Sequence, residues 1–424
     1  MKPVTTTFFG ALALGLCSVG SAQSLTPIQQ LGKSIFFDEN LSLNGNQACA
    51  ACHGPEVGFT GPIEEFNLHG TVYEGSIPGR FGNRKPPSAA YATRSPILHQ
   101  EKSGNEDLWV GGNFWDGRAT GDILGNPAAD QALGPFLNPM EQALPDSACV
   151  VYRVCDPDDP ESYPVSFKEV WGEGACDIEW PMDVETVCST EDATVALTPE
   201  DRELSDMTYG NIGLSIANYE DSPEVNAFTS KFDYSRRGQA KLTQQERLGW
   251  ALFNGKAKCS ACHTANGQEA LFTDFTYDNL GVPKNPENPV YDYNPGFIDY
   301  GLGGYLQGLG YEGDAYEPEL GKVKVPTLRN VDLRPSDDFV KAFGHNGYFK
   351  SLEEIVHFYN TRDVKDRCDD PLTPVADAIA QDCWPEPEVD ANVNTDELGD
   401  LGLSPDEEAA IVAFLKTLSD GYMP

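Results

Sequence analysis

The stretches "CAACH" (residues 49–53) and "CSACH" (residues 259–263) decide how this 424-residue chain is organised. Each follows a similar segment: "LTPIQQLGKSIFF" (25–37) precedes the first and "LTQQERLGWALFN" (242–254) precedes the second. Both segments carry a threonine suited to a helix start and apolar residues at helical spacing. The chain therefore predicts two halves built on one plan, each with a short helix before its C-x-x-C-H motif.

The spacing C-x-x-C-H is typical of covalent attachment of a c-type haem, in which two thiols bond the porphyrin and the histidine binds the iron. A single copy could equally be a disulfide, a redox pair or a fragment of a zinc site. Two copies, each after the same helix pattern, favour haem attachment. We therefore predict two covalent c-type haems, with the attachment and iron-binding residues Cys49, Cys52, His53, Cys259, Cys262 and His263.

Abundant glycine (41) and proline (31), with little strand-like alternation, predict a mainly α protein with long loops. We expect two cytochrome c-like domains, each with one covalently attached haem. The N-terminal domain is predicted over 23–235 and the C-terminal domain over 236–424, because the repeated helix pattern restarts just after "SRRGQAK" (235–241).

The first residues of the chain have the pattern of an export signal. Lys2 supplies a positive start, "FFGALALGLCSVG" an apolar core, and "GSA" a small-residue cleavage site, which predicts a signal peptide over 1–22. The apolar run is too short to span a membrane, and no later segment is long enough. We expect a periplasmic protein without a transmembrane segment, with the cell surface as the alternative.

The formal net charge of −37 disfavours nucleic acid and anionic membranes as partners. The stretch 146–203 holds sixteen Asp and Glu against three Lys and Arg. We interpret about 142–196 as an acidic, cysteine-containing insertion, either a solvated surface loop or a docking surface for a partner protein.

Six cysteines remain after the two haem motifs and the signal segment: Cys149, Cys155, Cys176, Cys188, Cys368 and Cys383. An even number in an exported chain predicts three disulfides. Pairing by proximity would join 149 with 155, 176 with 188, and 368 with 383, although six cysteines allow fifteen connectivities.

Four further segments make the chain resemble the bacterial di-haem cytochrome c peroxidases, and within them the MauG-like branch. They are "NFWDGRA" (113–119), "QALGPFLNPME" (131–141), "VPTLRNVDLRP" (325–335) and "GHNGYFKSLEEIVHFYNTRD" (344–363). The resemblance implies that Glu141 moves protons as peroxide is cleaved, with Gln131 as its pocket partner. It also implies that Trp115 lies between the haems and can relay an electron. His69, sixteen residues after His53, matches a removable sixth ligand of the first haem in conventional peroxidases of the family.

Tyr359 matches the distal ligand of the second haem, which is Met in conventional peroxidases and Tyr in MauG-like enzymes. No methionine occurs between Cys262 and Met423, and tyrosine can bind haem iron. "SLEE" at 351–354 reads as a capping box, so Tyr359 shares a helix face with Leu352 and Ile355 and points inward. The alternative is a buried core tyrosine.

His345 matches a histidine in the pocket of the second haem. The family often holds a calcium ion between its domains, with an asparagine among its ligands. Here that segment reads "GNRKPPS" (82–88), with Lys85 at the asparagine position and Asn83 displaced, which counts against calcium.

The predicted function is an exported di-haem peroxidase that reduces hydrogen peroxide with electrons from a protein. The MauG resemblance implies that this protein is oxidised at a side chain, such as a tryptophan. The enzymatic alternative is a conventional cytochrome c peroxidase with a cytochrome c or cupredoxin donor. The non-enzyme alternative is a di-haem electron-transfer cytochrome. The sequence leaves a homodimer open.

Overall fold

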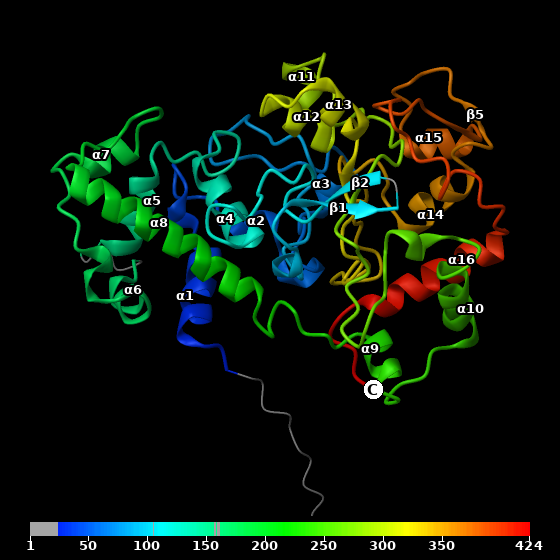
Figure 1. Ribbon diagram of the computed structural model, residues 1–424, viewed down its shortest axis with the longest axis horizontal. Coiled ribbons are helices and arrows are strands. Elements are labelled where there is room, and N and C mark those ends of the chain that lie inside the picture. Colours follow the sequence, from blue (N-terminus) through cyan, green and yellow to red (C-terminus); the bar gives the residue numbers. More distant parts are fainter. Residues whose placement is uncertain (1–23, 105, 157, 159–161) are drawn as a thin grey trace, which may run out of the picture.

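The structure is a computed structural model that describes residues 24–104, 106–156, 158 and 162–424. The predicted signal peptide over 1–22 lies outside the described residues. Figure 1 shows α1 and α4–α8 at one end of an elongated molecule, with α10 and α14–α16 at the other.

The helices of the first half are α1 (Pro27–Phe36), α2 (Cys49–Cys52), α3 (Glu64–Leu68), α4 (Pro127–Leu137), α5 (Ser147–Cys155), α6 (Pro164–Trp171), α7 (Val184–Cys188) and α8 (Pro199–Glu220). Those of the second half are α9 (Lys231–Arg236), α10 (Gln244–Phe253), α11 (Val290–Tyr293), α12 (Gly301–Gly308), α13 (Gly313–Tyr316), α14 (Leu352–Thr361), α15 (Val375–Ala380) and α16 (Pro405–Leu415).

The strands of the described residues are short and form three two-stranded sheets. The antiparallel pairs are β1 (His99–Ser103) with β2 (Glu106–Val110), and β3 (Tyr277–Asp278) with β4 (Val323–Lys324). The parallel pair is β5 (Asp366–Arg367) with β6 (Cys383–Trp384). The mainly helical prediction is confirmed.

The repeated segments fold into equivalent helices, α1 and α10, each started by a capping box at Thr26 or Thr243. The glycine that stands at the same place in both repeated segments, Gly32 in α1 and Gly249 in α10, has a packing reason. A Cβ on Gly32 would lie 1.9 Å from Ser215 O in α8, and one on Gly249 would lie 1.9 Å from Ala410 O in α16. Helix α1 therefore crosses α8, and α10 crosses α16, with their backbones in contact, which only glycine permits.

Each half has its own hydrophobic core. The first core draws its buried residues from Leu31 to Phe228, and the second from Phe232 to Leu418. The change from the first core to the second falls between Phe228 and Phe232, close to Ser235, where the predicted first domain ends.

The two cores are tied together across the seam. Arg329 of the second half is fully buried, pairs with Asp233, and lies over the rings of Tyr91 and Phe228 at 4.7 and 4.5 Å. Tyr91 Oη in turn donates to Asp420 at 2.6 Å. A buried ion pair packed against two touching rings of the other half fixes how the halves meet.

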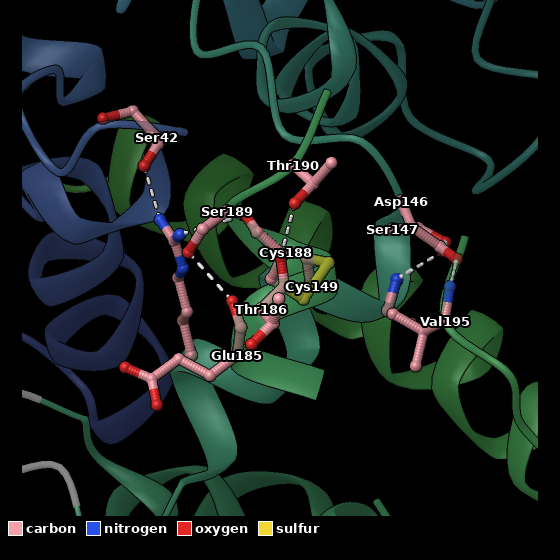
Figure 2. Close-up of a disulfide and its surroundings, with 12 residues drawn as sticks. Ser42, Asp146, Ser147, Cys149, Glu185, Thr186, Cys188, Ser189, Thr190 and Val195 are labelled. Atoms are coloured by element: carbon pink, nitrogen blue, oxygen red, sulfur yellow. Dashed lines mark hydrogen bonds between the residues drawn. A yellow bond between two sulfur atoms is a disulfide. The ribbon is translucent and has the colours of Figure 1, made fainter. Parts of the chain in front are cut away.

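The acidic stretch is not a loop. Its helices α5, α6 and α7 contribute buried residues to the first core, including Val150, Val154 and Phe167. Asp146 caps α5, accepts from Val195 N at 2.9 Å, and pairs with Arg202 of α8. Figure 2 shows the Val195–Asp146 contact beside the disulfide of this region.

Two of the three predicted disulfide pairings are wrong. The structure joins Cys149 to Cys188 (Figure 2) and Cys155 to Cys176, with Cα atoms 5.3 and 5.5 Å apart. Cys149 and Cys155 both lie on α5, where six residues rise about 9 Å and turn to a different face. That exceeds the span of a disulfide. The predicted Cys368–Cys383 pair is confirmed.

None of the helices in the described residues is long and apolar enough to cross a membrane.

Candidate functional site: two cavities that share a wall

The two C-x-x-C-H motifs each line a cavity. Cys49, Cys52 and His53 lie in the wall of the first, which has a volume of about 700 Å³. The corresponding residues of the second motif line the second, of about 210 Å³. All four cysteines are free thiols, and burial raises the pKa of Cys49 and of Cys259 to about 12.

The two motif histidines are held in the same way. His53 Nδ1 lies 3.1 Å from Phe59 O, and His263 Nδ1 lies 2.8 Å from Phe272 O. A carbonyl oxygen only accepts, so Nδ1 carries the proton in each ring and Nε2 is left with its lone pair. Burial lowers the pKa of both imidazoles, which keeps them neutral. A backbone partner of this kind is what orients a metal-binding histidine.

Buried polar atoms without partners gather in these walls. Gln47 Oε1, Gln142 Oε1 and Glu220 Oε2 belong to residues that line the first cavity. His345 Nδ1 and Arg329 Nε belong to residues that line the second. Buried polar atoms are normally satisfied, so each cavity has the character of a site completed by a bound group. Together with the paired thiols and oriented imidazoles, the residues fit one haem in each cavity.

Glu141 and Gln131 line the first cavity together, as predicted partners should. Gln131 comes from α4, and Glu141 from the turn that follows it, where Glu141 N donates to Asn138 O at 2.9 Å. Burial raises the pKa of Glu141, while the Arg118 guanidinium and a hydrogen bond with Asn138 lower it. A partly desolvated carboxyl in a cavity wall is suited to proton transfer.

Trp115 lies in the wall of both cavities. Its Nε1 donates to Lys85 O at 2.8 Å, and Lys85 N donates to His345 O at 2.9 Å. The Trp115 and His345 rings are 6.4 Å apart. The indole is therefore fixed between the halves by a hydrogen-bonded path that ends in the second half.

Tyr359 lines the second cavity with His263. The predicted capping box at Ser351 and Glu354 starts α14, and Leu352, Ile355 and Val356 line the same cavity. The predicted inward face is thus confirmed. Burial raises the pKa of Tyr359, so the hydroxyl by itself keeps its proton. No methionine lies in this wall.

His69 lies at the surface, outside both cavities. It follows α3, its side chain is 57% exposed, and it does not line either cavity. Its imidazole faces Glu65 at 3.5 Å and Glu287 at 3.1 Å, and Lys350 Nζ holds its carbonyl. In this arrangement carboxylates at the surface hold the ring, and removable ligation of the first haem by His69 stays a prediction.

The predicted pocket residue His345 belongs to a polar chain that sequence reasoning missed. Arg84 lines the first cavity and binds both carboxylate oxygens of Asp299, at 2.6 and 2.7 Å. Asp299 in turn lies 3.8 Å from Nε2 of His345, which lines the second cavity. Burial opposes ionisation of Asp299, but the Arg84 guanidinium holds its pKa well below the ordinary range. Glu388 lies 4.0 Å from the same nitrogen of His345, and burial and the nearby Asp299 raise the pKa of Glu388 to about 7.

Glu220 is a second missed residue. Ile216 in α8 and Ile411 in α16 line their respective cavities, and four residues further on Glu220 and Leu415 do the same. Burial raises the pKa of Glu220 to about 8. The internal repeat could have revealed Glu220, because the first half carries this acid at the position where the second half carries Leu415.

Comparisons with known proteins agree with this geometry. A family model described as di-haem cytochrome c peroxidase matches residues 27–241. Methylamine utilization protein MauG of Paracoccus denitrificans is 32% identical, over 96% of this chain and 94% of its own. Cytochrome-c peroxidase IdrP1 of Denitromonas iodatirespirans is 26% identical, over 92% and 80%.

Among solved structures, the diheme peroxidase BthA from Burkholderia thailandensis has a TM-score of 0.70 and 27% identity, covering 94% of this chain and 87% of its own. A MauG-like protein associated with microbial copper homeostasis has the same fold, with a TM-score of 0.60, 22% identity, and coverage of 94% and 91%.

Proposed function

Because the chain belongs to the di-haem cytochrome c peroxidase family, we propose that it is a MauG-like haem peroxidase, an exported enzyme of the periplasm that reduces hydrogen peroxide with electrons drawn from a protein. Cys49 and Cys52 would attach the first haem and Cys259 and Cys262 the second, with His53 and His263 as iron ligands. Bound at these positions, the haems supply the one-electron chemistry that peroxide reduction needs.

The observation that carries the MauG-like assignment is that Tyr359 lines the second cavity together with the motif histidine His263, in a wall without methionine. For ligation the hydroxyl must give up its proton, and an anionic oxygen favours the oxidised metal. Asp278 and Glu397 are the carboxylates that line the same cavity, and they would be the acceptors of that proton.

In the first cavity Glu141 would take a proton from one oxygen of peroxide and return it to the oxygen that leaves as water. Gln131 would orient the bound peroxide from α4. Each peroxide then needs two electrons and two protons to give two waters. Trp115, in the wall of both cavities, is placed to pass electrons from the second half to the first.

Replacing Glu141 with Gln tests the catalytic assignment. The amide keeps the shape but cannot carry the proton, so peroxide consumption should fall by about a hundredfold or more while two haems stay attached. Glu224→Gln provides the matched control, because Glu224 lies outside both cavities in a partly exposed pair with Lys33. Unchanged turnover in Glu141→Gln would overturn the role of this residue.

A conventional cytochrome c peroxidase is the second candidate, because relatives named cytochrome-c peroxidase match 92% of the chain. Steady oxidation of a reduced cytochrome c by peroxide would favour it. The surface position of His69 favours the MauG-like assignment.

A further inference from the structure

Three lysines lie inside the molecule at the seam between the halves. Lys85, Lys324 and Lys341 all line the second cavity, and Lys85 also lines the first. Among the described residues, their ammonium groups contact neutral oxygen atoms and form no ion pair with a carboxylate. Charged groups placed inside a protein without counter-ions are unusual and call for a function.

Lys341 binds both halves at once. Its Nζ donates to Val57 O of the first half at 2.9 Å, and to Asn330 O and Leu333 O of the second at 3.0 and 2.9 Å. An ammonium has three protons and a neutral amine only two. The three carbonyl acceptors around Lys341 therefore match the three protons of its charged ammonium form.

Lys324 makes the reciprocal contact. It lies on β4 of the second half, and its Nζ donates to Ser95 Oγ at 2.6 Å, to Asn113 Oδ1 at 3.0 Å and to Gly112 O, all in the first half. Lys85 Nζ donates to Thr60 Oγ1 at 2.8 Å and to Pro86 O at 3.1 Å, while its backbone links Trp115 to His345.

Burial lowers the pKa of Lys85 to about 8 and that of Lys324 to about 7, and burial also lowers the pKa of Lys341 well below its ordinary value. The acceptor sets of Lys324 and Lys341 oppose this effect, because three oxygens around one nitrogen are satisfied only by the ammonium. The charged form is therefore the one that completes the seam.

Protein oxygen atoms, such as backbone and amide carbonyls, are also the ligands that calcium binds. The family resemblance places a calcium ligand at position 85, where this chain has a lysine. The residues do not fit the metal: the oxygens of the seam already accept from ammonium groups, and a divalent cation beside three of them would be repelled. Asn83 faces the first cavity instead.

We propose that Lys324 and Lys341 act as built-in cations that join the two halves, that Lys85 fills the position of the calcium ligand with a third cation, and that the protein takes no divalent cation at this seam. The ammonium groups of Lys324 and Lys341 hold the oxygen-rich edges of the halves together, and the backbone of Lys85 continues this contact to Trp115 and His345.

The first test uses the purified holoprotein at about pH 6, below the pKa of about 8 for Lys85 and of about 7 for Lys324. Metal analysis should find no calcium in stoichiometric amount. The melting temperature and the haem absorption spectrum should be the same after treatment with EGTA and after addition of excess Ca²⁺. One tightly held calcium per chain, or a melting temperature that falls with EGTA and recovers with Ca²⁺, would overturn the proposal.

The second test removes the charges one at a time with Lys341→Met and Lys324→Met, which keep the apolar stem. Lys416→Met is the matched control, since Lys416 forms an exposed pair with Glu353 at 3.3 Å. Both seam variants should melt several degrees below the control, and Ca²⁺ should not restore them. A seam variant as stable as the control would overturn its role. If neither seam variant folds, the chelation test on the wild-type holoprotein still decides the proposal.

Discussion

The indole Nε1 of Trp115 donates a 2.8 Å hydrogen bond to the carbonyl oxygen of Lys85, and the ring forms part of the wall between the two cavities. Side chain and acceptor both come from the first half, but the acceptor residue is bound in turn to His345 of the second. The group proposed to carry electrons between the halves is thus fixed by the same contacts that hold the halves together.

Replacing Trp115 with Phe should slow the passage of electrons between the two haems without loss of either. The phenyl ring cannot donate to Lys85 O, so we also expect a loss of stability of about 1 kcal/mol. Stopped-flow absorption at the bands of the second haem, after mixing with peroxide, gives the rate. Trp180→Phe is the control, because Trp180 packs against Tyr152 away from both cavities. Equal rates in the two variants would contradict a relay through Trp115.

Replacing Cys49 and Cys52 together with Ser should reduce the covalently bound haem from two per chain to one. A pyridine haemochrome assay on the denatured protein counts the attached haems. The control is Cys149→Ser with Cys188→Ser, which should keep both haems but lower the free energy of unfolding by about 2–4 kcal/mol through loss of a disulfide. Two attached haems in the first variant would rule out attachment at this motif.

Replacing Tyr359 with Phe should change the absorption and EPR spectra of the second haem and raise its reduction potential, because an anionic ligand to the oxidised iron is lost. Haem content should remain two per chain. Tyr348→Phe is the control: Tyr348 is buried in the same half, and its hydroxyl donates to Thr373 O at 2.9 Å. A Tyr359→Phe spectrum identical to that of the wild type would mean that Tyr359 is only a core tyrosine.

Replacing Glu220 with Gln should stabilise the holoprotein at alkaline pH more than at acidic pH. Burial raises the pKa of Glu220 from an ordinary 4.5 to about 8, so the folded chain keeps a proton that the unfolded chain releases. Between these values a rise in pH favours unfolding, by an amount on the order of a few kcal/mol. The amide has no proton to lose.

Urea unfolding near pH 5 and near pH 9 measures this difference. Glu224→Gln is the control, because Glu224 lies outside both cavities in a partly exposed pair with Lys33, and such pairs contribute little to stability. A gain in stability for Glu220→Gln that is equal at both pH values would contradict an ionisable group in the first cavity.

Much of the fold could be predicted from local signals. The helices at Thr26, Thr243 and Ser351 begin with the predicted side-chain caps, because a cap depends only on residues three positions apart. The inward face of Tyr359 followed from helical period alone. The mainly helical character of the chain followed from composition.

The failures involve contacts between distant segments. Proximity in sequence paired Cys149 with Cys155, but both lie on α5, whose rise keeps them apart. The partner of Cys149 is instead Cys188, from α7. The spacing of His69 from His53 likewise gave no sign of Glu287, more than two hundred residues away, which contacts the His69 ring at the surface. The three acceptors of Lys341 are backbone carbonyls, and no sequence pattern records where those lie.

The most direct test of the central claim is to add one equivalent of hydrogen peroxide to the fully ferric holoprotein and follow absorption and EPR. With Tyr359 bound to the second haem and His69 away from the first, the ferric signals of both haems should be lost rapidly, without a reductant. If the ferric protein does not react until one haem has been reduced, the first haem is closed by a sixth ligand, and the MauG-like assignment is wrong.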